Sequence, residues 1–257
     1  ETMTTNINHA HTLSKSNFKI AQGCPTKLYY KKNGYPSADD GNEYMEYLAE
    51  GGYVVGVMAK MYYPGGIEID TSQGMDIAAL QTADLLLLDN VVLFEAVLYS
   101  NNKLVAIDIL VKVGNHFNII EVKSKGVDES LKLDKAWQEH LEDITYQKLT
   151  LKECYPDSTI DSYLFVPNKS ATTDIDNLYS QFKMFDKSNE NGFQSFEIQF
   201  DGDKEEIVKD NLLIKVNVNP QVEALEKVVK KSAKKHIAQL ISGEKPNVQI
   251  TKDCFSC

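Results

Sequence analysis

The sequence predicts a mixed α/β fold built around a small antiparallel sheet. Three observations support this prediction. The hydrophobic pattern has a helical period near the start of the chain, changes to short β-rich runs in the middle, and returns to a helical period afterwards. Turn-forming residues separate the β-rich runs. Finally, 257 residues of which 42% are hydrophobic can fill one large core, so we expect a single domain spanning residues 1–257.

The amino-terminal part of the chain is predicted to be helical. A helical pattern covers residues 17–32, and Pro25 is expected to break or kink it because proline lacks the N–H that a helix interior needs. A second helix is expected over about 42–62 and a third over 78–88. The third pattern is apolar on nearly all sides, which predicts that this helix is buried.

The centre of the chain is predicted to form a three-stranded antiparallel meander. Its β-rich runs cover residues 91–99, 104–111 and 117–123, with turn compositions at 100–102 and 114–115 between them. A long helix over about 134–152 and an apolar strand over 159–166 follow. The expected core, about 42–166, is therefore a helix, three strands, a helix and a strand.

Two further parts complete the predicted domain. A helical segment, residues 13–41, precedes the core, and a mixed α/β part, residues 167–257, follows it. In the second part we expect a helix at 177–185, strands at 196–200 and 212–218, and a Lys-rich amphipathic helix at 220–241. No polar loop is long enough to act as a linker, so these parts are additions to one domain.

The charge balance limits the functions to consider. Acidic residues outnumber basic ones by 37 to 27, and the net charge of −10 argues against binding nucleic acid through global electrostatic attraction. No apolar run approaches the roughly 18 residues of a membrane span, and the first residues lack the apolar core of a secretion signal. We expect a cytoplasmic protein without a membrane partner.

Three charged residues interrupt the apolar strands of the predicted meander. Asp108 lies in the second strand, and Glu121 and Lys123 share one face of the third because side chains alternate along a strand. The turn at 114–115 makes these strands neighbours, so a suitable register brings two carboxylates and a lysine together. The ordinary alternative is a buried ion pair, which places charges in similar surroundings.

Such a trio suits metal-assisted hydrolysis of a phosphodiester. Paired carboxylates hold one or two magnesium or manganese ions, which neutralise the phosphate and lower the pKa of a bound water. The lysine positions that water and stabilises the charge that develops on phosphorus. We therefore expect a divalent metal at Asp108 and Glu121, with Lys123 beside it.

These residues resemble the D…ExK signature of the PD-(D/E)XK nuclease superfamily, whose core has the order of elements predicted here. Leu13-Ser14-Lys15-Ser16 followed by Gly23-Cys24-Pro25, and Tyr63-Pro64-Gly65-Gly66 further along, are similar to the amino-terminal part of RecB-like exonucleases related to the CRISPR-associated branch. The resemblance covers about residues 13–166. It implies a restriction-endonuclease-like core with helical amino-terminal and mixed α/β carboxy-terminal additions.

The resemblance assigns roles residue by residue. Asp108 and Glu121 become metal ligands, Lys123 the catalytic lysine, and Gln147 the glutamine of the RecB-type QxxxY motif. Two departures stand out, because Leu151 replaces the tyrosine of that motif, and Gly56 stands where many relatives carry a histidine. The third group beside the metal is thus unidentified, and the two carboxylates to consider are Glu50 and Glu95.

The cysteines add a second expectation. Cys254-Phe-Ser-Cys257 has a metal-type or cluster-type spacing. In the resembling exonucleases an early cysteine joins such a group to hold an iron–sulfur cluster, which implies Cys24, Cys254 and Cys257 as ligands here. The fourth ligand is open, because it could be Cys154, a residue outside this sequence, or absent. A zinc ion at the same place is the lesser alternative.

The function expected from the sequence is a metal-dependent DNA exonuclease in DNA repair, recombination or defence, acting on DNA that is single-stranded or has free ends. The main alternative is an inactive nuclease-fold module that binds nucleic acid or protein, with the carboxylates reduced to ion pairs. A restriction-type endonuclease shares the chemistry but is expected to cut circular DNA.

Overall fold

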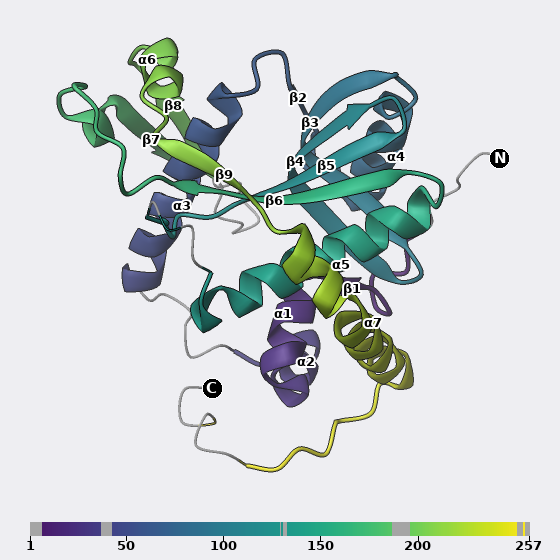
Figure 1. Ribbon diagram of the computed structural model, residues 1–257. Helices are drawn as coiled ribbons and strands as arrows, with labels where there is room; N and C mark the ends of the chain where they lie inside the picture. The colour runs from purple at the N-terminus through teal and green to yellow at the C-terminus, as the bar shows by residue number, and fades with distance from the viewer. Residues whose placement is uncertain are drawn as a thin grey trace.

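The protein has a mixed α/β fold in which helices cover both faces of a mixed sheet, as Figure 1 shows. The computed structural model describes residues 7–36, 43–128, 130, 133–186, 196–250 and 254, with only the backbone for 43–50, 186 and 196. The mixed α/β class expected from the sequence is confirmed. Its assignment to the restriction-endonuclease-like fold stays a prediction.

The central sheet has the strand order β2-β3-β4-β5-β6-β9, and β1 pairs with β4 beside this row. The strands β3, β4 and β5 are antiparallel, so the expected meander is confirmed. The pairs β1–β4, β2–β3 and β5–β6 are parallel, and β6–β9 is antiparallel. Their bounds are β1 Leu13–Ser14, β2 Ile67–Glu68, β3 Asn90–Ser100, β4 Lys103–Val113, β5 His116–Val122, β6 Thr159–Pro167 and β9 Leu213–Asn217.

The helices form two layers. On one face of the sheet lies α5, with α1 and α7 packed against it, and α4 lies against β3. On the other face lies α3, next to α6 and the separate β7–β8 hairpin. Their bounds are α1 Lys15–Gly23, α2 Pro25–Lys32, α3 Glu43–Met61, α4 Met75–Leu85, α5 Gln138–Cys154 after the 3₁₀ turn η1 Lys135–Trp137, α6 Lys204–Lys209, α7 Asn219–Ser242, β7 Phe182–Asp186 and β8 Phe196–Phe200.

The predicted break in the first helical pattern is confirmed at Cys24. This residue has an extended backbone, and Pro25 occupies the first position of α2, where a missing N–H is tolerated. The chain therefore turns between α1 and α2. Thr26 of α2 donates a hydrogen bond to the carbonyl of Pro246, so the carboxy-terminal tail runs along this helix.

Two predictions about secondary structure are wrong. Residues 177–185 are not helical, because a short 3₁₀ turn, η2 Leu178–Gln181, leads directly into β7. The helix expected over 78–88 ends at Leu85, and it is not buried all round, since Leu80 is 43% exposed and Leu87, beyond its end, is 82% exposed. Only its Ala78, Ala79 and Thr82 face is buried.

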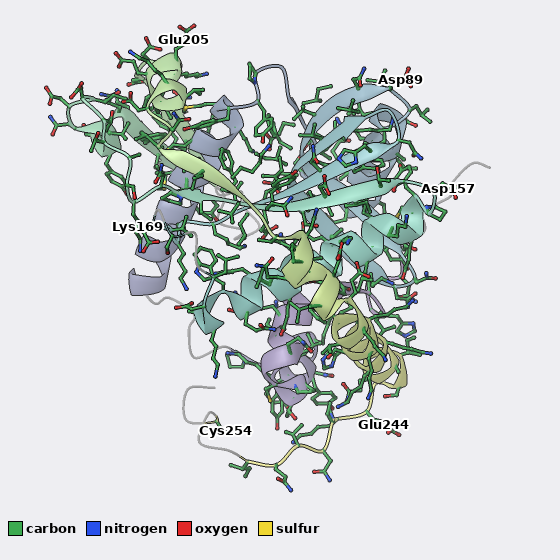
Figure 2. All side chains as sticks on the ribbon, in the orientation of Figure 1. Asp89, Asp157, Lys169, Glu205, Glu244 and Cys254 are labelled. Atoms are coloured by element: carbon green, nitrogen blue, oxygen red, sulfur yellow. The ribbon has the colours of Figure 1, made fainter. Side chains whose placement is uncertain are left out.

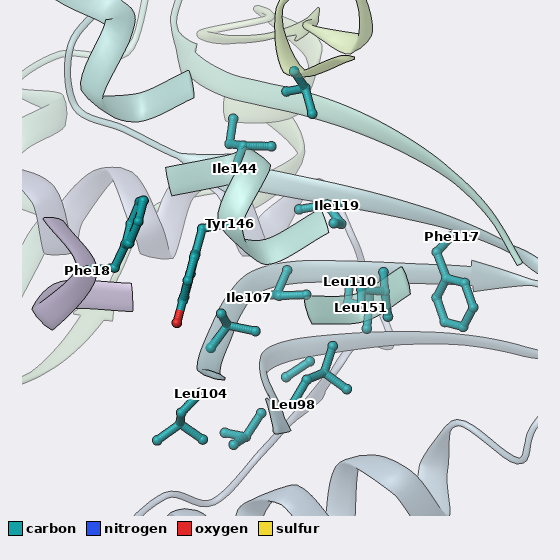
Figure 3. Close-up of a cluster of buried hydrophobic side chains, with 14 of the residues drawn as sticks. Phe18, Leu98, Leu104, Ile107, Leu110, Phe117, Ile119, Ile144, Tyr146 and Leu151 are labelled. Carbon is teal, nitrogen blue, oxygen red and sulfur yellow. The ribbon is translucent and has the colours of Figure 1, made fainter. Parts of the chain in front are cut away.

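The main core lies between the sheet and α5 (Figure 3). It contains Ile144 and Leu151 of that helix, both with no exposed surface. Tyr146 stacks on Phe18 of α1 with ring centroids 4.4 Å apart, and its hydroxyl donates to the carbonyl of Leu13 at 2.7 Å. A single buried side chain thus joins β1, α1 and α5.

Along the described part of the chain, none of the helices combines the length and hydropathy that crossing a membrane requires.

We predict that Tyr146→Phe destabilises the protein by about 1–2 kcal/mol, because the buried carbonyl of Leu13 loses its side-chain donor. Chemical denaturation measures this change. The matched control is Tyr179→Phe at an exposed position, for which we expect less than about 0.5 kcal/mol. Equal effects in the two variants contradict the proposed role of the Tyr146 hydroxyl.

Candidate active site

Three carboxylates occupy one row across the meander. Phe94 pairs with Ile109 and Ala96 with Ile107, which puts Glu95 of β3 opposite Asp108 of β4. The pairing of Ile109 with Ile120 continues the row, because the next residues along each strand are Asp108 and Glu121. The local register that the sequence suggested is therefore present.

Asp108 lies in a gap between two neighbours of β4. Strand β1 pairs with Lys103 and Leu104, whereas the ladder with β5 covers positions 109–113, so neither ladder includes Asp108. Its Oδ2 accepts a hydrogen bond from the backbone N–H of Val122 at 2.7 Å. Its side chain remains 24% exposed. The gap thus leaves a partly exposed carboxylate in the middle of the sheet.

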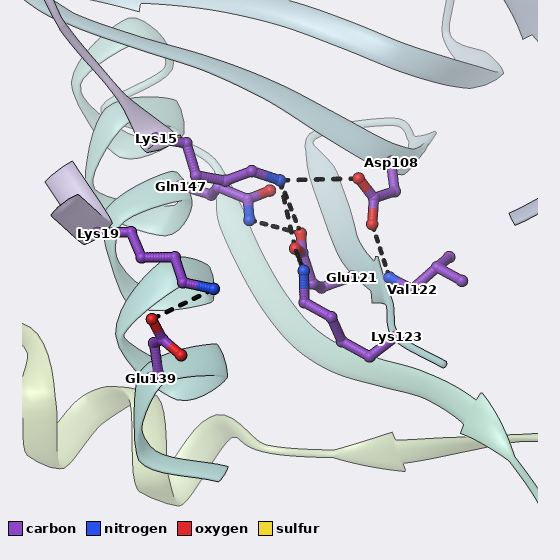
Figure 4. A network of polar contacts seen from close by, with 8 residues as sticks. All are labelled: Lys15, Lys19, Asp108, Glu121, Val122, Lys123, Glu139 and Gln147. Carbon is purple, nitrogen blue, oxygen red and sulfur yellow. Dashed lines mark hydrogen bonds and ion pairs between the residues drawn. The ribbon is translucent and has the colours of Figure 1, made fainter. Parts of the chain in front are cut away.

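Glu121 is fully buried, and three side chains donate to its carboxylate (Figure 4). The Nζ of Lys123 donates to Oε1 at 2.6 Å, and the Nε2 of Gln147 donates to Oε2 at 2.6 Å. Lys15 of α1 contacts both carboxylate oxygens at 3.2 Å. Its Nζ also lies 3.6 Å from Oδ1 of Asp108. The two carboxylates therefore converge on one ammonium group.

The structure brings together Asp108, Glu121, Lys123 and Gln147, the four residues predicted from the sequence, and adds Lys15. The sequence analysis quoted Lys15 only as part of the family resemblance. No local pattern predicts its contact, because it is 106 residues from Glu121. Its position follows from β1, which fixes the chain directly before it.

Contacts between α1 and α5 hold Lys15 in place. Ser14 caps α1 by accepting from the N–H of Asn17. Lys19 pairs with Glu139 at 3.2 Å, as Figure 4 also shows, and Gln22 donates to Glu142 at 3.1 Å. Because α5 also carries Gln147, the same two helices fix two of the donors to Glu121.

The charges in this network shift the protonation equilibria of its members. Burial disfavours the ionised form of Glu121, but Lys15 and Lys123 outweigh it and lower the pKa of this carboxyl to about 2. Burial and the charge of Glu121 raise the pKa of Asp108. Burial acts against both lysines, yet the carboxylates raise the pKa values of Lys15 and Lys123. We infer that Glu121 is ionised and both lysines are charged at neutral pH.

Glu95, one of the two further carboxylates considered from the sequence, has an unusual backbone. Its φ of 56° is in the left-handed region, which non-glycine residues adopt infrequently and which stores strain. Burial, followed by the charge of Asp108, raises the pKa of its carboxyl to about 7. Glu50, the other carboxylate, lies on the part of α3 whose side chains are outside the described residues.

Asp143 is a second residue that sequence reasoning missed. It lies on α5 one turn before Gln147, and only 4% of it is exposed. Burial, and then the charge of Glu121, raises the pKa of its carboxyl to about 7. Its position four residues before Gln147 is the signal that could have found it, because such residues share a helix face. The charge of Glu121 therefore acts on a second buried carboxyl, on the same helix as Gln147.

The site opens into a pocket of about 450 Å³ between α3 and the sheet. Asp108, Glu95 and Lys123 line it on one side, and Gly52 and Gly56 of α3 line it on the other. Gly56, where many members of the resembling family carry a histidine, thus contributes open space. Tyr146 is next to Gln147 in the sequence, but its buried hydroxyl donates to the carbonyl of Leu13. It therefore does not take the place of the tyrosine that Leu151 replaces in the QxxxY motif.

The pair of carboxylates fits a divalent cation by its chemistry. Carboxylate oxygens are the ligands that magnesium and manganese prefer. In this structure the ammonium of Lys15 is the cation between the carboxylates of Asp108 and Glu121. Within the ranges that the structure describes, no group of three or more His, Cys, Asp or Glu side chains has the geometry of a metal site. Asp108 and Glu121 alone would therefore hold the ion, with Glu95 next in the row.

The predicted cluster ligands are only partly described. Cys24 lies between α1 and α2, Cys254 lies on the exposed tail seen in Figure 2, and Cys257 is outside the described residues. Lys245 of the tail donates to the hydroxyl of Tyr30 at 2.7 Å, which brings the tail to the helix that follows Cys24. An iron–sulfur cluster at these cysteines stays a prediction.

Cys154 does not suit the role of fourth ligand. Its thiol donates to the carbonyl of Tyr99 at 3.6 Å, and burial raises its pKa to about 11, which disfavours the thiolate that a metal needs. Cys154 is also distant from Cys24. Glu142 of α5 contacts Gln22, which is two residues before Cys24, and Cys154 lies twelve residues further along α5, a separation of about 18 Å. Cys154 is a structural thiol at the other end of that helix.

Comparison with known proteins adds no identity. No family model matches the chain, and no curated protein matches it.

We predict that Asp143→Asn stabilises the metal-free protein more at pH 8 than at pH 5. In the folded protein Asp143 holds its proton up to about pH 7, whereas the unfolded chain releases it near pH 4, so stability falls as pH rises through this window. Asparagine removes that penalty. Denaturation in chelator at both pH values is expected to give a difference of roughly 1–2 kcal/mol. A stability difference independent of pH contradicts this assignment.

Proposed function

We propose that the protein is a divalent-metal-dependent DNA exonuclease of RecB-like type within the PD-(D/E)XK superfamily. The observation that carries the proposal is the convergence of Asp108 and Glu121, from adjacent strands, on one cationic atom beside Lys123. Gln147 reaches the same carboxylate from α5. These are the residues that the D…ExK resemblance selects, and two of them, Asp108 and Lys123, line an open pocket.

The proposed reaction is hydrolysis of a phosphodiester by water. A magnesium or manganese ion bound at the carboxylates supplies positive charge for the phosphate and a water of lowered pKa. Lys123, whose charge is maintained by Glu121, orients the attacking water and stabilises the charge that develops on the phosphate oxygens. Gln147 fixes the orientation of Glu121 through its amide.

Lys15 and Asp143 have supporting roles in this scheme. The ammonium of Lys15 lies between the two carboxylates, and like charges repel, so it must move aside when a divalent ion binds. Asp143 exchanges its proton near neutral pH and lies on the same side of α5 as Gln147, which suits it to accept a proton from the site.

A second candidate function is favoured by the same contacts. Glu121 already accepts hydrogen bonds from two lysines and an amide, as expected of a structural ion-pair network. In that case the protein is a nuclease-fold module that binds nucleic acid or a partner protein without cleaving it. Metal binding separates the two candidates.

We predict that Glu121→Gln and Lys123→Ala each reduce cleavage of end-labelled DNA in magnesium or manganese by at least about 100-fold. The first variant removes the charge of a proposed metal ligand, and the second removes the cation at the reacting phosphate. Lys209→Ala, an exposed lysine on α6, is the control and is expected to cleave normally. Circular and linear substrates, single- and double-stranded, distinguish exonuclease from endonuclease. Activity retained by both site variants rejects the assignment.

We also predict that magnesium or manganese raises the melting temperature of the wild-type protein, by about 2–4 °C per kcal/mol of binding free energy. Asp108→Asn should abolish this shift. Lys15→Met should require less metal for the same shift, because it removes the competing ammonium. An unchanged melting temperature in all three proteins favours the binding module over the enzyme.

A further inference from the structure

The pocket beside the carboxylates continues into a second one. This second pocket, of about 600 Å³, lies between α3 and the β8–α6 segment, and Val57, Lys60 and Ile198 line both pockets. The two pockets therefore form one groove that leads from Asp108 along α3. We call it the α3 groove. Figure 1 shows the β7–β8 hairpin and α6 beside α3, and Figure 2 marks α6 by Glu205.

At the end nearest the carboxylates, the floor of the α3 groove lacks side chains at two positions of the helix. Gly52 and Gly56 are four residues apart, so they lie on one face of α3, and both line the pocket at the carboxylates. A Cβ built at either position meets no atom within 4 Å among the described residues. Glycine weakens a helix interior, and packing within the described chain does not require it here. The glycines leave depth for a ligand instead.

The walls of the groove carry cations and aromatic rings. Lys60 lies over the ring of Phe94 at 5.4 Å and pairs with Glu68 at 2.8 Å. Lys204 is exposed at the opposite wall, where no described acidic residue forms an ion pair with it. Asp201, on the same wall, is paired with Lys183. Tyr63, Phe94 and Phe200 supply the rings along the second pocket. Cations with adjacent rings are the features that bind a single nucleic-acid strand.

We propose that the α3 groove binds the nucleotides flanking the scissile phosphate on a single DNA strand, with α3 as its floor and the β7–β8 hairpin with α6 as its outer wall. This inference rests on the proposed function, because only a nuclease has a scissile phosphate at Asp108 and Glu121. It assigns a binding role to Gly56, Phe200 and Lys204, which the cleavage chemistry does not use.

The shape of the groove favours a single strand over a duplex. Ile198 of β8 lines both pockets across from α3, so the groove has two walls along its length. Each pocket has the volume of a site for one drug-sized molecule, which is the scale of one or two nucleotides. Bases that enter such a groove must be unpaired, because paired bases face each other inside a duplex.

The test is fluorescence anisotropy of a labelled oligo(dT) of about 12 nucleotides, measured in chelator so that nothing is cleaved. We expect Gly56→Leu to weaken binding at least roughly tenfold by filling the floor, and Lys204→Ala to weaken it severalfold. Matched controls are Gly51→Leu, on the same helix but outside the groove, and Lys209→Ala, on the same helix as Lys204. Both controls should bind within about twofold of wild type.

The melting temperature of each variant shows whether weaker DNA binding comes from a filled groove or from a destabilised fold. Gly56→Leu should melt at or above the wild-type temperature, because leucine is a better helix former than glycine. Weaker DNA binding together with equal or greater stability supports the groove. Wild-type-like binding by both Gly56→Leu and Lys204→Ala, or no oligo(dT) binding by the wild type, overturns it.

A small substrate separates this inference from the proposed function. Hydrolysis of bis(p-nitrophenyl) phosphate requires the carboxylates and Lys123 but not the groove, so Lys204→Ala should keep wild-type activity on it. Hydrolysis by the wild type with unaltered strand binding in both groove variants rejects the groove alone. Loss of strand binding in those variants, with no hydrolysis by the wild type, supports the groove and rejects the nuclease.

Discussion

The structure of this site depends on keeping one buried carboxylate ionised. Glu121 has no exposed surface, and an unpaired charge in such surroundings costs several kcal/mol. Lys15 of α1, Lys123 directly after β5 and Gln147 of α5 offset that cost from three different parts of the chain. The arrangement of these elements around the sheet is therefore tied to a single side chain. Lys15 also contacts Asp108, so the network that stabilises Glu121 places both carboxylates around one ammonium group.

Much of the fold was predictable because its information is local. The alternation of apolar residues in β3, β4 and β5 and the turns between them lie within a few residues of each other, and so does the break at Pro25. The wrong predictions concern residues whose secondary structure or burial depends on contacts distant in the sequence. Phe182 and Met184 become strand residues because they pair with Phe200 and Ile198 of β8, which a helical pattern in residues 177–185 does not reveal. Leu80 and Leu87 are exposed although their surroundings in sequence are strongly apolar.

In the candidate site too, local sequence patterns predict some of the residues, whereas others depend on contacts distant in the sequence. Asp108, Glu121 and Lys123 follow from strand alternation and one tight turn, and Gln147 follows from the family resemblance, so all four could be named from the sequence. Lys15 could not be predicted from the residues alone, because its contact depends on a two-residue parallel strand beside β4. Asp143 could be reached only through Gln147, because the two are four residues apart on the face of α5 that turns toward Glu121. The strained backbone of Glu95 likewise has no signature in the sequence.

The parallel pairing of Leu13 and Ser14 with β4 also bears on how the chain is made. The ribosome releases these residues long before Lys103, and pairings between distant segments form slowly. Until then Phe18 lacks the aromatic ring of Tyr146 on which it later stacks. Phe18 and Ala21, the buried residues of α1, therefore stay without this packing partner until about half of the chain has been added after them.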